Sequence, residues 1–239
     1  MSLVRPQSQE EQVGRLVLAG ALVLFLPALP FGGYLLYPFT ILTTWFHEMG
    51  HGLAAMATGN DFQQLVILPD GSGVATSDLD HDTGALTRAL IAMGGPLGPS
   101  VVGAGLIMAS SRHRWWRPVL LAMAAALALS TLIWVRSLTG WLVLPALAAG
   151  LAWLAWQPRA AWQLFALQFL GVLAALSMFH DWDYLFSNAA VIGGQPMLSD
   201  TGAIAAELWL PYWFWAAVIV GLSGLMVGAS LKFALNREG

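Results

Sequence analysis

Long apolar runs separated by short polar segments dominate the pattern of hydrophobic and polar positions along the chain. A helix that crosses a bilayer needs roughly 17–25 predominantly apolar residues. Runs close to or within this range occupy residues 16–30, 38–58, 84–110, 119–135, 141–156, 160–179 and 208–231. We therefore expect an all-α polytopic membrane protein with six or seven transmembrane helices.

Proline and glycine are expected to shape two of the helices. Gly94, Pro96 and Pro99 fall inside the run 84–110, where the missing N–H groups predict a kink or a break. Ser199 is expected to begin a helix that continues through Glu207 into the final apolar run.

A β-hairpin is predicted directly after the second apolar run, over residues 62–77. Strand-forming side chains lead into a Pro-Asp-Gly turn and a second β-rich stretch. The first stretch is either part of a connecting loop or a strand near a functional site that presents an extended substrate by strand addition. The residues of this candidate strand are Leu65, Val66, Ile67 and Leu68.

We expect one integral membrane domain over residues 1–239, with no internal repeat. Three segments lie between or before the spans. They are an N-terminal segment 1–15, an acidic linker 78–83, and an apolar stretch 184–199 that forms a loop or a re-entrant segment.

Composition supports a membrane protein and excludes several other classes. Hydrophobic residues make up 58% of the chain and charged residues 10%, with a mean hydropathy of +0.69, whereas soluble domains carry about a quarter charged residues. The net charge of −3 and the thinly spread basic residues predict no nucleic-acid partner. Because the chain has no cysteine, any metal must be held by histidine or carboxylate side chains.

The candidate chemistry lies in the second apolar run. Between residues 16 and 60, the only side chains that can be charged near neutral pH are those of His47, Glu48 and His51. Residues four apart share one face of a helix, so both histidines can bind one metal ion while Glu48 lies beside them. Ionisable side chains are costly in a membrane and usually functional there. This spacing predicts a zinc site with Glu48 as the base that activates water.

A third protein ligand is expected from elsewhere in the chain, because catalytic zinc usually has three. Asp181 follows an uncharged span, where a carboxylate most needs a partner, and it is the first candidate. Asp200 and Asp183 are alternatives for the third ligand or for a contact to a ligand, although Asp200 can also be explained as a helix cap beside Ser199. The remaining candidates are Asp70, His180 and Glu207.

Four short motifs together resemble the site-2 protease clan of intramembrane zinc metalloproteases, specifically its peptidase M50B-like branch. They are His-Glu-Met-Gly-His at 47–51, Pro-Asp-Gly-Ser-Gly at 69–73, Asp-Trp-Asp-Tyr at 181–184 and Ser-Asp-Thr at 199–201. The resemblance implies zinc held by His47, His51 and a late aspartate, with Glu48 as base. It also implies cleavage of membrane-protein or peptide substrates. Better-known members carry the aspartate in an Asn-Pro-Asp-Gly-like motif on a later helix, whereas the Pro-Asp-Gly here lies in the early hairpin.

Two other functions fit the same residues. A catalytically inactive relative would act as a membrane binding or chaperone-like protein, and a metal-ion transporter would use the ligands as a transit site. In each case we expect a multi-pass protein of the bacterial plasma membrane that contacts lipid. Basic-residue counts with seven spans favour an external N-terminus, and the resemblance favours an internal one. The sequence defines no oligomeric state.

Overall fold

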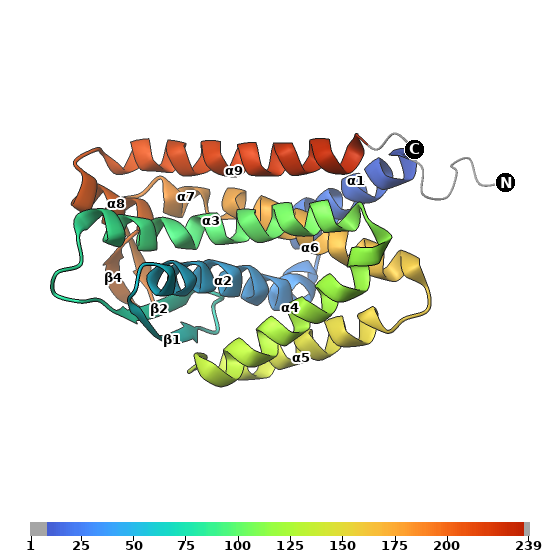
Figure 1. The fold of residues 1–239 in the computed structure, drawn as a ribbon, viewed down its shortest axis with the longest axis horizontal. Helices are drawn as coiled ribbons and strands as arrows, with labels where there is room; N and C mark the ends of the chain where they lie inside the picture. Colours follow the sequence, from blue (N-terminus) through green and yellow to red (C-terminus); the bar gives the residue numbers. More distant parts are fainter. Residues whose placement is uncertain (1–8, 237–239) are drawn as a thin grey trace.

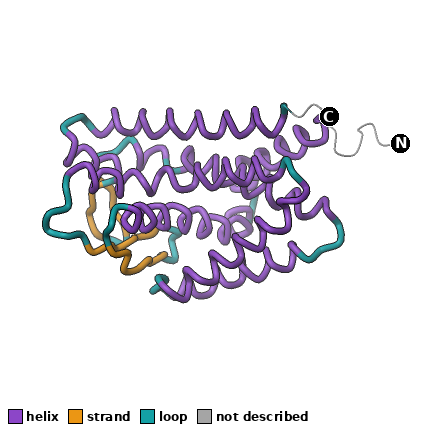
Figure 2. The backbone as a smooth tube through the Cα atoms, in the orientation of Figure 1, coloured by secondary structure: helices purple, strands orange, loops and turns teal. Residues whose placement is uncertain are grey.

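The computed structural model describes residues 9–236, apart from the side chains of residues 179 and 180. The first part of the predicted N-terminal segment and the side chain of His180 therefore lie outside the described residues. Figure 1 shows a bundle of long helices with the short elements gathered at one end, and Figure 2 shows both strand pairs at that end.

The long helices account for most of the chain. They are α1 (Gln9–Phe25), α2 (Gly32–Ala57), α3 (Ala85–Ser110), α4 (His113–Ile133), α5 (Leu138–Ala155), α6 (Ala160–His180) and α9 (Tyr212–Leu235). The short elements are η1 (Leu26–Ala28), β1 (Asp61–Ile67), β2 (Gly73–Asp78), α7 (Trp182–Leu185), β3 (Ala189–Ile192), β4 (Gln195–Leu198) and α8 (Asp200–Leu208).

Six helical stretches in the described part of the chain are long and apolar enough to cross a membrane. They are Glu10–Ala28, Ala85–Ser110, His113–Ile133, Leu138–Ala155, Ala160–Met178 and Tyr212–Leu235. Helix α2, which carries His47, Glu48 and His51, is not among them, although it has 26 residues and packs inside the bundle against α3, α5 and α6. The prediction of an all-α polytopic protein with a small hairpin is confirmed, and the chain is an integral, multi-pass membrane protein.

The backbones of α2 and α3 cross in very close contact. A β carbon at Gly50 would lie 2.1 Å from the carbonyl oxygen of Gly94, and one at Gly98 would lie 2.5 Å from the carbonyl oxygen of Phe46. Small residues are common where membrane helices approach closely, because lipid provides no hydrophobic drive for association. This crossing holds the polar segment of α2 directly against α3.

The predicted hairpin is present, and it lies along α2. Strands β1 and β2 pair antiparallel, and the hydroxyl of Tyr37 donates to the carbonyl of Pro69 in the turn. The other edge of β1 is also used, because the N–H of Leu65 donates to Trp134 and the N–H of Arg136 donates to Leu65, at 2.9 Å each. Among the described residues, β2 is therefore the edge strand of this sheet.

Three expectations for the later elements differ from the structure. Helix α3 continues through Pro96 and Pro99 without a break. The predicted final helix is two helices, because Trp209 has a φ of 66° and Pro211 lacks the N–H that a continuous helix would use. The apolar segment 184–199 contains α7 and the hairpin β3–β4, whose two-residue turn is made by Gly193 and Gly194 with φ of 58° and 78°.

Candidate metal centre

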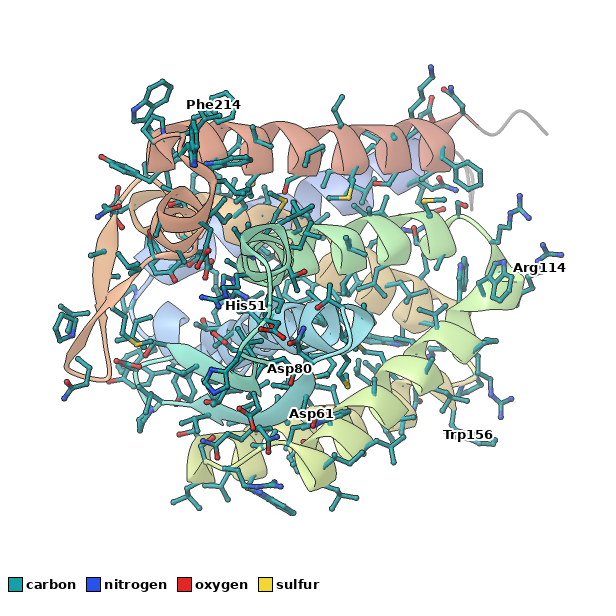
Figure 3. The ribbon with its side chains drawn as sticks, turned by 60° about the vertical axis from the view of Figure 1, so that its left-hand side comes forward. His51, Asp61, Asp80, Arg114, Trp156 and Phe214 are labelled. Atoms are coloured by element: carbon teal, nitrogen blue, oxygen red, sulfur yellow. The ribbon has the colours of Figure 1, made fainter. Side chains whose placement is uncertain are left out.

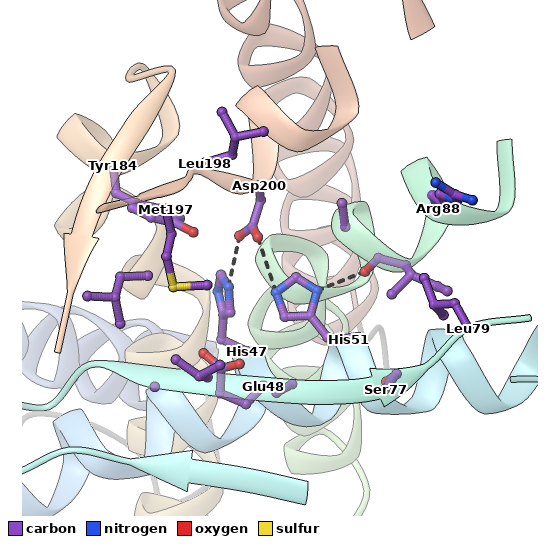
Figure 4. Close-up of a pocket in the computed structure, with 16 residues that line it drawn as sticks. His47, Glu48, His51, Ser77, Leu79, Arg88, Tyr184, Met197, Leu198 and Asp200 are labelled. Carbon is purple, nitrogen blue, oxygen red and sulfur yellow. Dashed lines mark hydrogen bonds and ion pairs between the residues drawn. The ribbon is translucent and has the colours of Figure 1, made fainter. Parts of the chain in front are cut away.

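The two histidines of α2 point into the same space. His47 and His51 lie one helical turn apart, with their ring centroids 4.9 Å from each other. Asp200 from α8 meets them there: its Oδ2 lies 2.9 Å from Nε2 of His47 and its Oδ1 lies 3.2 Å from Nε2 of His51 (Figure 4). In the described part of the chain, these residues form the group of histidine and carboxylate side chains that could hold a metal ion.

Hydrogen bonds at the start of α8 fix the position of Asp200. Ser199 is the N-cap residue, and its hydroxyl accepts the N–H of Gly202 at 3.0 Å and donates to the carbonyl of Ser187. Thr201 donates its hydroxyl to the carbonyl of Leu185 at 2.7 Å. Because Ser199 already caps the helix, Asp200 is not needed as a cap, and its carboxylate points toward the histidines.

The environment of the three side chains fits a bound cation. Nδ1 of His51 lies 2.8 Å from the carbonyl of Ile91, and since a carbonyl only accepts, this nitrogen carries the proton. When this ring is neutral, its Nε2 carries the lone pair, and that lone pair faces the carboxylate of Asp200. Oδ2 of Asp200 is buried, and it lies 2.9 Å from Nε2 of His47. A positive ion between the Nε2 atoms and the carboxylate of Asp200 would be attracted by all of these electron-rich atoms. A His-His-Asp set is typical of zinc.

Glu48 lies beside this group but is not part of it. The side chain is buried, with 6% of its surface exposed, and its carboxylate accepts a hydrogen bond from the backbone N–H of Ala75 in β2. A β carbon at Gly73 would lie 2.8 Å from Oε1 of Glu48. The close approach of β2 thus holds the carboxylate of Glu48 between the strand and the candidate metal centre, which consists of His47, His51 and Asp200.

The orientation of β2 follows from its pairing with β1. Leu65 directs its N–H and C=O away from β2, so the Leu65–Ala75 pair is one of the pairs that exchange no hydrogen bonds. The N–H and C=O of Ala75 therefore point outward, toward Glu48 and the metal centre. The predicted substrate-presenting stretch needs correction, because Leu65 and Ile67 are fully buried and both edges of β1 are occupied; the exposed edge belongs to β2.

A cavity of about 290 Å³ opens over the metal centre. One wall is β2, another is the beginning of α3, and a third is the β3–β4 hairpin together with Tyr184. The residues that line the cavity in addition to His47, Glu48, His51 and Asp200 are Gly73, Val74, Ala75, Ser77, Leu79, Arg88, Ile91, Ala92, Tyr184, Ile192, Met197 and Leu198. The sequence predicted neither the role of β3–β4 nor that of Arg88 in this cavity.

The other predicted carboxylates lie outside the group. Asp181 lies at the C-terminal end of α6, where it lines a small space of about 10 Å³ next to His47 and Tyr184. Asp183 is exposed on α7. Asp70 accepts hydrogen bonds from the backbone and hydroxyl of Ser72, which lower the pKa of its carboxyl and explain the residue as part of the hairpin turn.

Glu207, the last of these carboxylates, lies 3.7 Å from Arg88 at the rim of the cavity. The structure thus brings the histidine pair together with Asp200, which the sequence offered as the alternative third ligand, and separates the pair from the other acids.

Comparison with known proteins gives one family. The sequence model of a family described as Peptidase M50B-like matches residues 16–230, which is most of the chain. No curated protein and no solved structure matches it.

Proposed function

Because the chain belongs to the Peptidase M50B-like family, we propose that it is an intramembrane zinc metalloprotease of the site-2 protease type. The observation that carries this proposal is the convergence of His47, His51 and Asp200 beside the buried carboxylate of Glu48. Asp200 takes the place of third ligand in this proposal, because its oxygens lie within 3.2 Å of both Nε2 atoms.

Zinc, when bound by these residues, supplies a Lewis acid that polarises a carbonyl and makes water more acidic. Glu48 accepts the proton of the attacking water and delivers it to the leaving amine. The N–H of Ala75 keeps the carboxylate of Glu48 in place for both transfers. Ile91 holds the ring of His51 in the tautomer that leaves Nε2 free for the metal.

The edge of β2 is the part of the site that binds the substrate backbone in this proposal. A helical substrate hides its carbonyl groups in its own hydrogen bonds, so the scissile region must be extended before hydrolysis. Strand addition satisfies the backbone groups that unwinding exposes. In this proposal the N–H of Ala75 stays bound to Glu48, and the substrate strand pairs with the remaining edge groups of β2, which lines the cavity beside Glu48.

The test compares the wild-type protein with Glu48→Gln after reconstitution in lipid. We expect one zinc per chain in both proteins, measured by elemental analysis, and a fall in peptide cleavage of about 10²–10⁴-fold in the variant. The matched control is Asp61→Asn, which removes an exposed carboxylate at the start of β1. Undiminished cleavage by Glu48→Gln would overturn the proposal. Peptide binding without cleavage by the zinc-loaded wild type would instead indicate an inactive relative, and zinc flux into sealed vesicles would indicate a transporter.

A further inference from the structure

Arg88 occupies an unusual position at the mouth of the cavity. Of the described residues that line the cavity, it is the one with a positively charged side chain. It lies on the same face of α3 as Ile91 and Ala92, which are three and four residues further along and also line the cavity. Its side chain is 43% exposed, so the guanidinium is accessible to a ligand.

Helix stability does not explain the charge at this position. Arg88 lies in the first turn of α3, where the helix dipole disfavours a cation. Glu207 lies at the end of α8, where the dipole disfavours an anion. The two charges are 3.7 Å apart, an ion pair that is too long for a hydrogen bond, and Nε of Arg88 donates to the carbonyl of Thr83 at 3.1 Å.

The two sides of the cavity differ in polarity. Figure 4 shows Arg88 and Leu79 on one side of the metal centre, and Met197 and Tyr184 on the other. The lining contributed by the β3–β4 hairpin is apolar, namely Ile192, Met197 and Leu198. A peptide that crosses the metal centre would therefore meet an apolar surface on one side of its scissile bond and a guanidinium on the other.

From this arrangement we propose that Arg88 is a specificity-determining residue that binds a carboxylate of the substrate. The preferred substrate then carries an apolar side chain on one side of the scissile bond and a carboxylate on the other. That carboxylate belongs either to an Asp or Glu side chain or to a nearby C-terminus. In the absence of substrate, the carboxylate of Glu207 pairs with the guanidinium of Arg88. The substrate carboxylate replaces it when substrate binds. The inference rests on the proposed function.

A purely structural ion pair between α3 and α8 is the competing explanation, and it makes a different prediction. If the pair only holds α8 in place, Arg88→Gln and Glu207→Gln break the same contact and reduce cleavage of all peptides alike. If Arg88 binds substrate, the two variants have opposite effects on acidic peptides, because Glu207 is the competitor of the substrate for the same guanidinium.

The experiment uses sets of lipid-reconstituted peptides that carry Glu, Gln or Lys at each position flanking the cleaved bond, each with a free or an amidated C-terminus. In the wild type we expect kcat/KM for the best acidic peptide to exceed that of its Gln partner by about two- to fivefold, as for a partly exposed charge pair. Arg88→Gln should bring this ratio to about 1, Glu207→Gln should raise it, and Arg88→Glu should favour Lys over Glu. The amidated set identifies whether side chain or C-terminus supplies the carboxylate.

The control is Arg136→Gln, since Arg136 donates to the carbonyls of Val135 and Ile133 and does not line the cavity. An unchanged ratio in Arg88→Gln, or equal losses in both ion-pair variants, would overturn the inference. The same peptide pairs are also measured for binding to zinc-loaded Glu48→Gln protein with and without Arg88→Gln. Absence of all cleavage would then count against the proposed function, while the ratio of binding constants would still decide the role of Arg88.

Discussion

Gly95 of α3 lies directly against the ring of His51. A β carbon at Gly95 would be 2.1 Å from Nε2 of His51 and 2.7 Å from Nε2 of His47. Because Gly95 has no side chain, the space that the Nε2 atoms of His47 and His51 face stays open. The close crossing of α2 and α3 makes this absence necessary, because neither helix can move away without breaking the Gly50–Gly94 contact.

The first prediction concerns Gly95→Ala. Alanine favours a helix over glycine by about 1 kcal/mol, so the substitution should not weaken α3 itself. Overpacking of a tight site costs about 1–3 kcal/mol, and here the cost falls on the metal-binding geometry, so zinc affinity should drop about tenfold or more. The control is Gly105→Ala in the same helix, where a β carbon would meet nothing within 4 Å. Equal zinc affinity in both variants, measured with a competing chelator, would contradict the prediction.

The second prediction separates the two late aspartates. Asp200→Ala removes a carboxylate within 3.2 Å of both Nε2 atoms and should abolish stoichiometric zinc binding. Asp181→Ala should retain the metal, with a loss of affinity of at most the roughly 10–100-fold typical of residues that only contact a ligand. Zinc content of the two purified variants checks this directly. Full zinc content in Asp200→Ala would return Asp181 as the candidate ligand.

Two of the three residues of the candidate metal centre could be predicted from the sequence, because helix periodicity alone brings them together. Residues four apart on one helix share a face in almost any fold, so His47 and His51 had to be neighbours. The third ligand depends on how α8 packs against α3, which in turn packs against α2, and the local patterns around Asp181 and Asp200 are similarly polar. One local signal did favour Asp200: Ser199 already supplies the cap that an acid at this position would otherwise provide.

The fold shows the same division between local and long-range information. The Pro-Asp-Gly turn is a strong local signal, and the β1–β2 hairpin was predicted within one or two residues. The β3–β4 hairpin was missed because its strands have only four residues each and its Gly-Gly turn lies in an apolar stretch that also suits a membrane loop. The edge strand next to the cavity was misassigned to β1, because the pairing of β1 with Val135 depends on the position of α4.

The third prediction uses proline to remove one backbone hydrogen-bond donor. Proline is tolerated on an edge strand where its nitrogen points away from the ladder, which is the situation of Ala75. Ala75→Pro should therefore fold and bind zinc, but it loses the N–H that holds Glu48. A hydrogen bond to a charged group contributes about 1.5–3 kcal/mol, so kcat/KM should fall about tenfold or more.

Val74→Pro is the matched comparison for that variant. Val74 pairs with Val66 at a position where the strands exchange hydrogen bonds, so proline there should disrupt the hairpin itself. Thermal unfolding monitored in detergent distinguishes the two variants. If Ala75→Pro cleaves peptides like the wild type, the contact between Ala75 and Glu48 has no role in catalysis.

The fourth prediction tests the cap that positions Asp200. Ser199→Ala removes the acceptor for the N–H of Gly202 and the donor to Ser187, and loss of an N-cap costs about 1 kcal/mol of stability. Because Asp200 is the next residue, zinc affinity should also fall. Ser199→Thr, which keeps the hydroxyl, should restore most of both quantities. A variant with lowered stability and full zinc affinity would show that Asp200 is positioned without the cap.

The last prediction concerns orientation in the membrane. Basic residues are concentrated at the end of the bundle away from the metal centre, and Figure 3 shows Arg114 far from Asp61 and Asp80. The basic residues at that end are Arg112, Arg114, Arg117, Arg159 and Lys232, whereas Arg88 and Arg136 lie at the metal end. Cytoplasmic segments of membrane proteins carry the excess of Lys and Arg. We therefore expect the α3–α4 junction in the cytoplasm and the metal centre near the opposite face.

Absence of native cysteine makes this expectation directly measurable. His81→Cys places a thiol in the exposed linker at the metal end, and His113→Cys places one at the exposed start of α4. A membrane-impermeant maleimide applied to intact cells should label the first variant, and it should label the second only after permeabilisation. The reverse pattern would contradict the charge argument and place the metal centre on the cytoplasmic side, where substrates would be cleaved at their internal rather than their external membrane boundary.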